Sequence, residues 1–231
     1  AIPREAEAHI SIHEEDVENV KHYFEDYEKN IKNELKNTEP GLILSFDEAS
    51  LPGYVIDEDT QHDLLNALYA CPHGVYAWSK EIEDLVETST NLAAIKTQKN
   101  GSYFITTSQR SSVESAKHDI ANMVESVFRL SNTKVSHSAG YPGWQPNTDS
   151  EILKITEEVY KKLFNKEPAV KAIHAGLECG LFLQKYPYLD MISIGPTIKG
   201  AHTPEERASI ETTREFWELL VEVLQNIPEN G

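Results

Sequence analysis

Cysteine, basic residues and long apolar runs are all scarce in this sequence, and each shortage excludes a class of protein. Its only cysteines are Cys71 and Cys179, too few for a disulfide scaffold and without the spacing of a zinc ribbon. Lysine and arginine total 21 against 38 acidic residues, so the formal charge of -17 argues against nucleic acid as a partner. No apolar run approaches the roughly 20 residues of a membrane span, and no signal-type segment is present. The composition fits a cytoplasmic protein with no membrane partner.

The first 145 residues predict an α+β domain. Apolar residues at steps of three and four predict helices, alternating or continuous apolar runs predict strands, and Asn100-Gly101 predicts a two-residue hairpin turn. Because the predicted strands and helices are interspersed along the chain, they favour a sheet with helices on one face. The expected strands are residues 7–13, 42–46, 91–97, 103–107 and 133–137, the expected helices are 17–35, 63–70 and 113–128, and 72–74 is expected to be a loop.

A change of architecture is predicted near residue 145, because two prolines and a glycine in Tyr141–Pro146 stop the preceding strand. Beyond it, Asp149 or Ser150 can cap a helix, and the following elements alternate as in an α/β domain. These are a helix over 152–163, a strand over 169–174, a helix over 177–186, a strand over 190–195 and a helix over 210–226. Because this is only half a sheet and the chain starts at Ala1 without methionine, we expect further strands upstream in a longer protein.

Two apolar runs of the second part, ending at Ile173 and Ile194, stop at glycine-containing polar segments. In α/β sheets, ligands bind at the carboxyl ends of strands, so these segments are candidates for a site. The second segment contains His202. Neutral imidazole is a common zinc ligand, although a lone histidine is more often a surface or capping residue.

Five segments of the chain resemble the carboxyl-terminal half of bacterial aminoacylhistidine dipeptidases, the carnosinase-type Xaa-His dipeptidases. They are Ala1-Ile-Pro-Arg-Glu5, Ser108-Gln-Arg-Ser-Ser112, Tyr141-Pro-Gly-Trp144, His174-Ala-Gly-Leu-Glu-Cys-Gly180 and Ile194-Gly-Pro-Thr-Ile-Lys-Gly-Ala-His-Thr-Pro-Glu-Glu-Arg207. The resemblance covers essentially the whole chain. It implies a metallopeptidase that hydrolyses Xaa-His dipeptides such as β-alanyl-histidine with two divalent metal ions, zinc or else manganese or cobalt.

The same resemblance implies the domain organisation. An α/β catalytic domain would be interrupted by an α+β lid, so residues 1–145 would be a lid that is incomplete at its amino end. Residues 146–231 would be the carboxyl-terminal part of the catalytic domain. The fold class expected is therefore α/β plus α+β.

The chain departs from the family pattern in its metal and catalytic residues. The family's His-x-Asp motif, bridging aspartate and catalytic Glu-Glu pair belong to the amino-terminal half, so we expect no catalytic residue in this chain. Its own Glu-Glu pairs are typical of solvated helix faces or first turns. Only one metal ligand is implied, at His202, and this chain alone is expected to be inactive.

Three further residues are candidates for binding substrate. Arg110 follows a predicted strand, and its planar guanidinium could hold the dipeptide carboxylate bidentately, or else form an ordinary surface ion pair. Glu178 could contact the cationic amine or imidazole of the substrate, or serve as a charge at a helix start. Asn91 is a second lid candidate, with a strand-edge or turn role as the alternative.

A different class of function stays open. An acidic α+β layer joined to half an α/β unit could be a lid or dimerisation module without chemistry of its own. Such a module could pair two copies of the chain in a homodimer. Another metallopeptidase or deacylase of the same superfamily is the remaining alternative. An upstream segment with the His-x-Asp and Glu-Glu motifs would favour the peptidase over the module.

Overall fold

The computed structural model describes residues 2–80, 82–138, 140–144, 147, 149–172, 178–201 and 203–228. The chain forms two compact units, of which the smaller is Arg4–His62 and the larger runs from Asp63 onward. Helices and strands are mixed in the larger unit, as expected. The boundary predicted between residues 145 and 146 lies inside this unit and stays a prediction.

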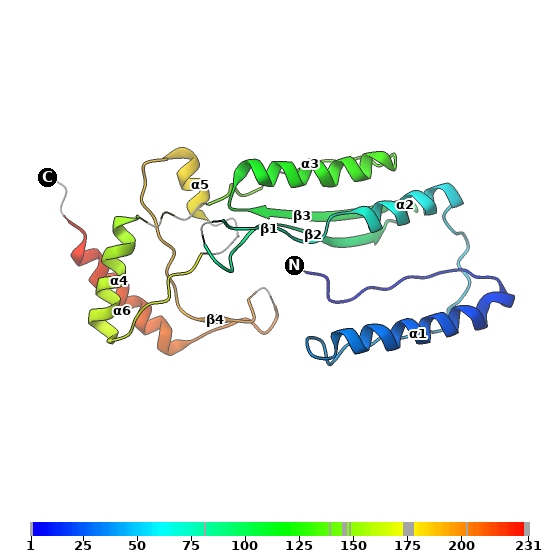
Figure 1. The fold of residues 1–231 in the computed structure, drawn as a ribbon, viewed down its shortest axis with the longest axis horizontal. Coiled ribbons are helices and arrows are strands. Elements are labelled where there is room, and N and C mark those ends of the chain that lie inside the picture. Colours follow the sequence, from blue (N-terminus) through cyan, green and yellow to red (C-terminus); the bar gives the residue numbers. More distant parts are fainter. Residues whose placement is uncertain are drawn as a thin grey trace. The chain divides into compact units, whose positions relative to one another are not determined.

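The smaller unit is built around one long helix. A short 3-10 turn, η1 (Glu14–Asp16), leads into α1 (Val17–Leu35), which spans the range predicted from its apolar spacing. Figure 1 shows the extended segment before this helix running back alongside it. The Phe24 ring packs on Phe46 with 5.5 Å between centroids, so the apolar stripe of α1 is covered in part by the segment around residue 46.

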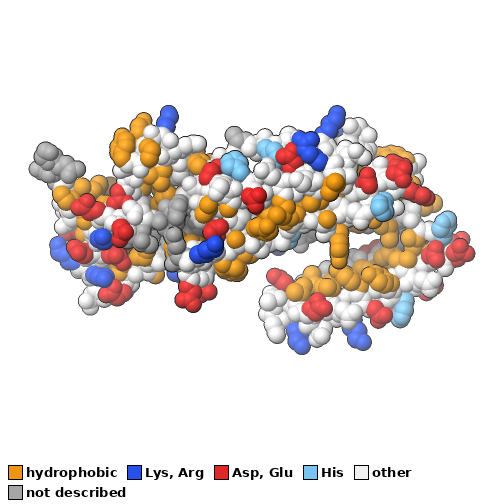
Figure 2. All heavy atoms as spheres, turned by 45° about the horizontal axis from the view of Figure 1, so that its top comes forward, with side chains coloured by type: hydrophobic (Ala, Val, Ile, Leu, Met, Phe, Trp, Pro, Cys, Tyr) orange, Lys and Arg blue, Asp and Glu red, His pale blue; other side chains and the backbone are white. Residues whose placement is uncertain are grey.

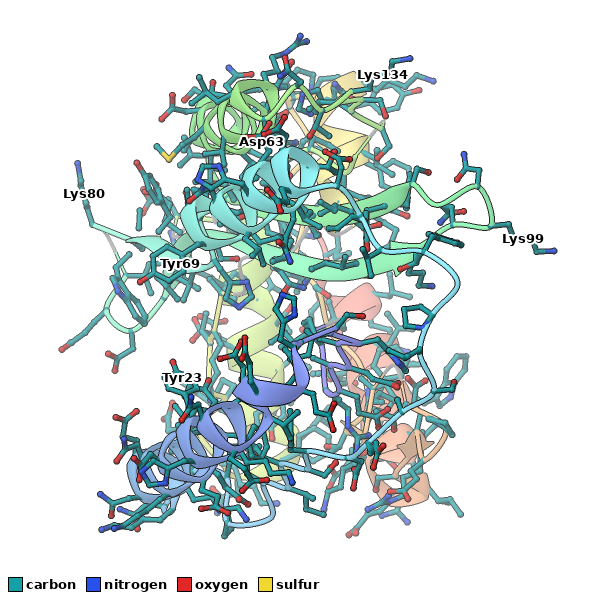
Figure 3. All side chains as sticks on the ribbon, turned by 90° about the vertical axis from the view of Figure 1, so that its right-hand side faces the viewer. Tyr23, Asp63, Tyr69, Lys80, Lys99 and Lys134 are labelled. Carbon is teal, nitrogen blue, oxygen red and sulfur yellow. The ribbon has the colours of Figure 1, made fainter. Side chains whose placement is uncertain are left out.

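A three-stranded antiparallel sheet forms the centre of the larger unit, in the order β1 (Gly74–Trp78), β2 (Val86–Thr97), β3 (Tyr103–Ser111). The predicted hairpin joins β2 to β3, but the two-residue turn expected at Asn100-Gly101 was wrong. Gln98 N–H donates to Ser102 O, so residues 99–101 form the turn. This turn carries Gly101 at φ +82, a backbone conformation that glycine adopts without strain, and Figure 3 shows Lys99 at its tip.

Two helices cover one face of this sheet, α2 (Glu58–Ala70) and α3 (Glu114–Leu130). Ala67 of α2 and Cys71 are buried against Val124 and Phe128 of α3, and Leu92 and Ile105 of the sheet pack on this cluster. The sheet therefore has a helix-covered face and an open face.

The rest of the larger unit is mainly helical. It contains α4 (Glu151–Phe164), α5 (Glu178–Lys185), α6 (Ile210–Asn226) and a small ribbon of β4 (Ile198–Lys199) with β5 (Arg207–Ala208). Val159 of α4 is buried against Leu219 and Val223 of α6. Among the described helices, none is long and apolar enough to cross a membrane.

A side-chain cap explains where α4 begins. Ser150 Oγ accepts a hydrogen bond from Leu153 N–H, so of the two predicted caps the serine is used. Asp190 Oδ2 accepts from Ile152 N–H and so adds negative charge at the same positive helix end. Burial alone raises the pKa of Asp190, but hydrogen bonds from Ile152 N–H and Ser150 outweigh it, so this pKa lies below its ordinary value.

Several expected strands are absent from the described residues. Residues 7–13, 42–46, 133–137, 169–172 and 190–195 form no strand there, while residues 173 and 174 lie outside the described part. A strand needs a hydrogen-bonding neighbour, which an apolar run does not itself supply. Val135 packs against the cluster of α2 and α3, and Ile194 packs against the cluster of α4 and α6, so these runs still bury apolar side chains.

The prediction of a loop at 72–74 was wrong at its end, because β1 begins at Gly74. Gly74 has φ +103, a conformation that glycine adopts without strain, and the chain turns there into β1, a strand that was not predicted from the sequence.

Candidate functional site

The open face of the sheet is defined by the register between β2 and β3. Residues directly opposite each other share a face, and faces alternate along each strand. On the helix-covered side, Thr88 Oγ1 and Ser111 Oγ lie 2.8 Å apart, and Gln109 Nε2 donates to Thr90 Oγ1 at 3.1 Å. Because both neighbours of Arg110 are tied to β2 on that side, Arg110 projects from the open face.

Four polar residues form a block at this end of the open face. Ser89 lies opposite Arg110, and Asn91 lies opposite Ser108 in the ladder. Side chains paired in this way have Cβ atoms about 5 Å apart. The structure thus brings together Asn91 and Arg110, two of the predicted substrate-binding residues, on adjacent strands.

Arg110 is the cation of this block. It is exposed, and its guanidinium makes no ion pair or side-chain hydrogen bond with another described residue. Asn91 is half-buried, with its side-chain oxygen enclosed. A guanidinium held beside an amide and two hydroxyl groups is suited to bind a carboxylate, because it offers a planar pair of donors with further donors around it.

Glu178 is exposed and is the first residue of α5. Gly180 of this helix packs against the backbone of Pro142, in the chain that follows α3. Burial raises the pKa of the neighbouring Cys179, and the charge of Glu178 raises it further, so Cys179 stays a thiol.

His202, the expected metal ligand, lies outside the described residues. The residues on its two sides lie in the connection between β4 and β5, where Thr203 Oγ1 donates to Gly200 O at 2.8 Å and Thr203 N–H donates to the same oxygen at 3.1 Å. Within the part of the chain that the structure describes, no group of three His, Cys, Asp or Glu side chains could hold a metal ion.

The sequence interpretation missed Ser89, Ser108 and His73. The period of two in a strand would have paired Ser108 with Arg110, because residues two apart share a face. His73 Nδ1 accepts a hydrogen bond from Leu92 N–H at 3.0 Å, close to where β1 stops pairing with β2. Only the fold reveals that contact, since 19 residues separate the two.

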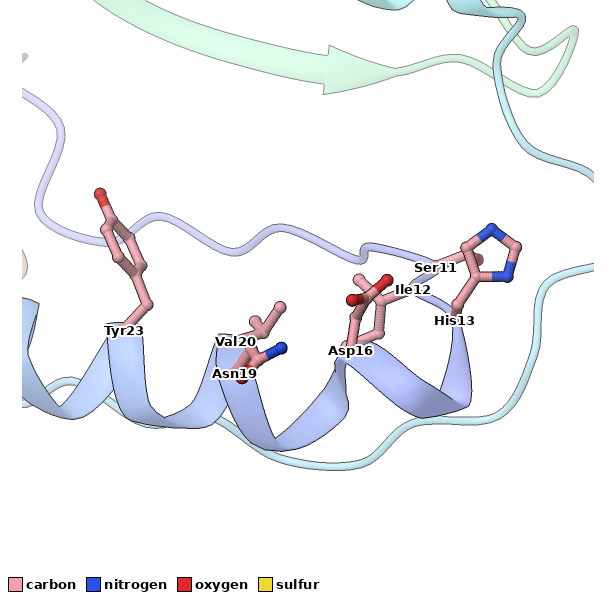
Figure 4. A pocket seen from close by; sticks show the side chains of 7 residues that line it. All are labelled: Ser11, Ile12, His13, Asp16, Asn19, Val20 and Tyr23. Atoms are coloured by element: carbon pink, nitrogen blue, oxygen red, sulfur yellow. The ribbon is translucent and has the colours of Figure 1, made fainter.

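The smaller unit carries an open hollow beside the start of α1 (Figure 4). Its lining is formed by Ser11, Ile12, His13, Asp16, Asn19, Val20 and Tyr23. Asp16 N–H donates to His13 O, so this backbone is fixed by the 3-10 turn. The hollow contains none of the residues predicted to bind substrate or metal.

Comparisons with known proteins agree with the resemblance seen in the sequence. Cytosol non-specific dipeptidase of Escherichia coli (strain K12) is 38% identical over 228 residues, which are 99% of this chain and 47% of that protein. The crystal structure of aminoacylhistidine dipeptidase from Vibrio alginolyticus matches with a TM-score of 0.78 and 36% identity, covering 94% of this chain and 44% of the other. The chain thus spans about half the length of these relatives. Residues 5–226 also match the model of peptidase family M20/M25/M40, and the chain belongs to this family.

Proposed function

We propose that this chain is the carboxyl-terminal part of a cytoplasmic metallo-dipeptidase that hydrolyses Xaa-His dipeptides such as β-alanyl-histidine. The names of the two relatives support a dipeptidase, and one of them is an aminoacylhistidine dipeptidase. The name of the other, a cytosol dipeptidase, supports the cytoplasm as the location. The observation that carries the proposal is the Arg110 guanidinium on the open face of the sheet, directly across from Ser89 and near Asn91.

The exposed surface of the chain supports the view that it is part of a larger enzyme. A compact monomer of this mass is expected to expose roughly 10,600 Å², and two separate compact bodies of the sizes of its units roughly 12,400 Å². The accessible surface is 18551 Å². Many large apolar side chains are exposed, and Figure 2 shows apolar side chains open to solvent on the face it presents. Such a surface is suited to being covered by further protein.

Substrate binding is assigned to three residues. Arg110 would hold the carboxylate of the dipeptide in a bidentate pair, and the Asn91 amide would add a hydrogen bond from the same face. Glu178, at the exposed start of α5, would accept from the cationic amine or the imidazole of the substrate. Closing these groups over the dipeptide would exclude water and orient the scissile bond.

The metal site is assigned to the complete enzyme. When bound, two divalent ions, zinc or else manganese or cobalt, would polarise the scissile carbonyl and lower the pKa of a bound water. His202 would be the ligand that this chain supplies, through a neutral imidazole. The remaining ligands and the catalytic glutamate would come from the amino-terminal half, so this chain alone would not turn over.

Kinetics of the complete enzyme test the substrate role of Arg110. β-Alanyl-histidine should be hydrolysed, and its amide analogue, which lacks the carboxylate, should show a much higher KM. Arg110→Ala should remove most of this difference in KM between acid and amide, because the side chain proposed to bind the carboxylate is removed. Lys99→Ala removes a cation from the hairpin tip of the same sheet and is the control. It should leave the ratio of the amide KM to the acid KM unchanged. An equal ratio in wild type and Arg110→Ala would contradict the assignment.

The alternative is a lid or dimerisation module without chemistry, which the exposed apolar surface also allows. Sedimentation of the chain distinguishes a homodimer from a monomer, and the absence of dipeptide turnover by the complete enzyme would favour the module.

A further inference from the structure

Three stretches of backbone meet at Gly143 with no room for a side chain. A methyl group at Gly143 would lie 2.6 Å from the Ser112 carbonyl oxygen and 2.9 Å from that of Ser111, closer than carbon atoms approach carbonyl oxygens. A methyl group at Gly180 would lie 2.8 Å from the Pro142 carbonyl oxygen. The segment 141–144 is thus enclosed between the end of β3 and the first turn of α5.

Gly143 and Gly180 are required for lack of space, and not for their backbone conformation. Neither Gly143 nor Gly180 has a φ in the left-handed region, so alanine could adopt both backbone conformations. Gly140, which immediately precedes this segment, would meet no atom within 4 Å if it carried a methyl group. The requirement for glycine is therefore specific to the crossing point.

The first turn of α3 holds the segment in place. Glu114 Oε2 accepts from Gly143 N–H at 2.9 Å and from Lys117 Nζ at 2.8 Å, and Lys117 also donates to the Tyr141 carbonyl oxygen at 2.8 Å. His118 Nε2 lies 3.2 Å from Glu114 Oε1. Burial raises the pKa of Glu114, but hydrogen bonds from Lys117 and Gly143 N–H, with the charges of Lys117 and His118, lower it more, so the carboxylate is ionised at neutral pH.

Both ends of this crossing lead directly to predicted substrate residues. Arg110 immediately precedes Ser111 on β3, and Glu178 lies two residues before Gly180 in α5. The contact between β3, the segment 141–144 and α5 therefore sets how far apart these two side chains stand.

We propose that Gly143 and Gly180, with Glu114 securing the Gly143 N–H, form a glycine joint that positions Arg110 relative to Glu178. All three are positioning residues that act through the backbone, without touching substrate. The functional part of this inference rests on the proposed dipeptidase activity, whereas its structural part does not.

Amide hydrogen exchange of Gly143 in this chain tests the structural part. The Gly143 amide should be protected in wild type and should exchange about tenfold faster in Glu114→Ala, because a hydrogen bond to a charged acceptor is lost. Glu125 lies further along the same helix, and Glu125→Ala, which removes its ion pairs with Arg129 and His137, is the matched control and should leave this amide protected. Equal exchange in Glu114→Ala and wild type would overturn the role of Glu114.

A matched pair of glycine variants in the complete enzyme tests the positioning. Gly143→Ala and Gly180→Ala should each raise KM for β-alanyl-histidine at least about tenfold, since a displacement of about 1 Å is enough to spoil alignment. Gly140→Ala should leave KM unchanged. At Gly180 the helix propensity favours alanine over glycine, so a raised KM in Gly180→Ala would come from the clash with Pro142.

The two parts fail separately. If the wild-type complete enzyme hydrolyses no dipeptide, the proposed function fails. The hydrogen-exchange result still tests whether Glu114 holds the Gly143 N–H. If the enzyme is active and Gly143→Ala, folded by circular dichroism, has the KM of Gly140→Ala, the positioning role is overturned. If Gly143→Ala raises KM and adding Arg110→Ala to it raises KM no further, the joint is supported, because both changes then act through the same contact with substrate.

Discussion

Replacing Ser111 by alanine should destabilise the chain more than any other serine change in the sheet. The Ser111 hydroxyl lies 2.8 Å from Thr88 Oγ1 and accepts from Val113 N–H at 3.0 Å, so it serves the sheet and the entry to α3 together. Thr88 and Ser111 are only 0% and 4% exposed, which leaves water little access to replace these bonds. Thr88 keeps a contact of 3.3 Å to Glu87, which limits the loss. At about 1 kcal/mol per hydrogen bond, with a further cost for a buried unpaired group, Ser111→Ala should lower the free energy of unfolding by about 2–3 kcal/mol.

Urea unfolding in a double-mutant cycle measures this effect. Ser111→Ala, Thr88→Val and the double variant should show a coupling of about 1 kcal/mol between the two hydroxyl groups. Ser108→Ala is the control, because Ser108 is exposed on the open face of the same strand and its loss should change stability by less than about 0.5 kcal/mol. Equal stability of Ser111→Ala and Ser108→Ala would show that the hydroxyl pair does not anchor the strand that carries Arg110.

Four further outcomes are expected. Arg110→Lys in the complete enzyme should raise KM for the dipeptide, because lysine lacks the bidentate fork, and an unchanged KM would remove Arg110 from the pocket. His202→Ala should abolish most activity and reduce the metal content, whereas wild-type turnover and metal content would refute the ligand assignment. Ile120→Ala, at a side chain with 0% exposure, should lower the free energy of unfolding by about 2–5 kcal/mol in urea titration. Because the pKa of Asp190 is lowered on folding, its stabilisation is present above the ordinary carboxyl pKa of about 4 and is lost as pH falls through the folded value, so the stability difference from Asp190→Asn should vanish in acid.

Helices were the part of the fold that sequence periodicity could predict. The ranges 17–35 and 210–226 agree with α1 and α6, since the spacing of apolar residues and the turn composition at their ends are local properties. Pairing of strands is not local. The segments 42–46 and 190–195 have the apolar content of strands but form none, because that content does not specify a hydrogen-bonding neighbour.

The candidate site was partly predictable for the same reason. Arg110 and Asn91 were found from residue type and resemblance, but only the register of β2 with β3 reveals that they share a face. The need for glycine at Gly143 could not be deduced from the sequence, because the atoms that exclude a side chain belong to Ser111 and Ser112, more than thirty residues away in the chain. The role of His202 stays a prediction.

Titration of the purified chain with zinc and manganese by calorimetry, together with an assay of β-alanyl-histidine hydrolysis, tests the central claim most directly. If this chain supplies only His202 to a metal site completed by an amino-terminal half, it should bind metal weakly or not at all and should show no turnover. Two tight metal sites with turnover would mean that the active site is complete within these 231 residues and would contradict the account.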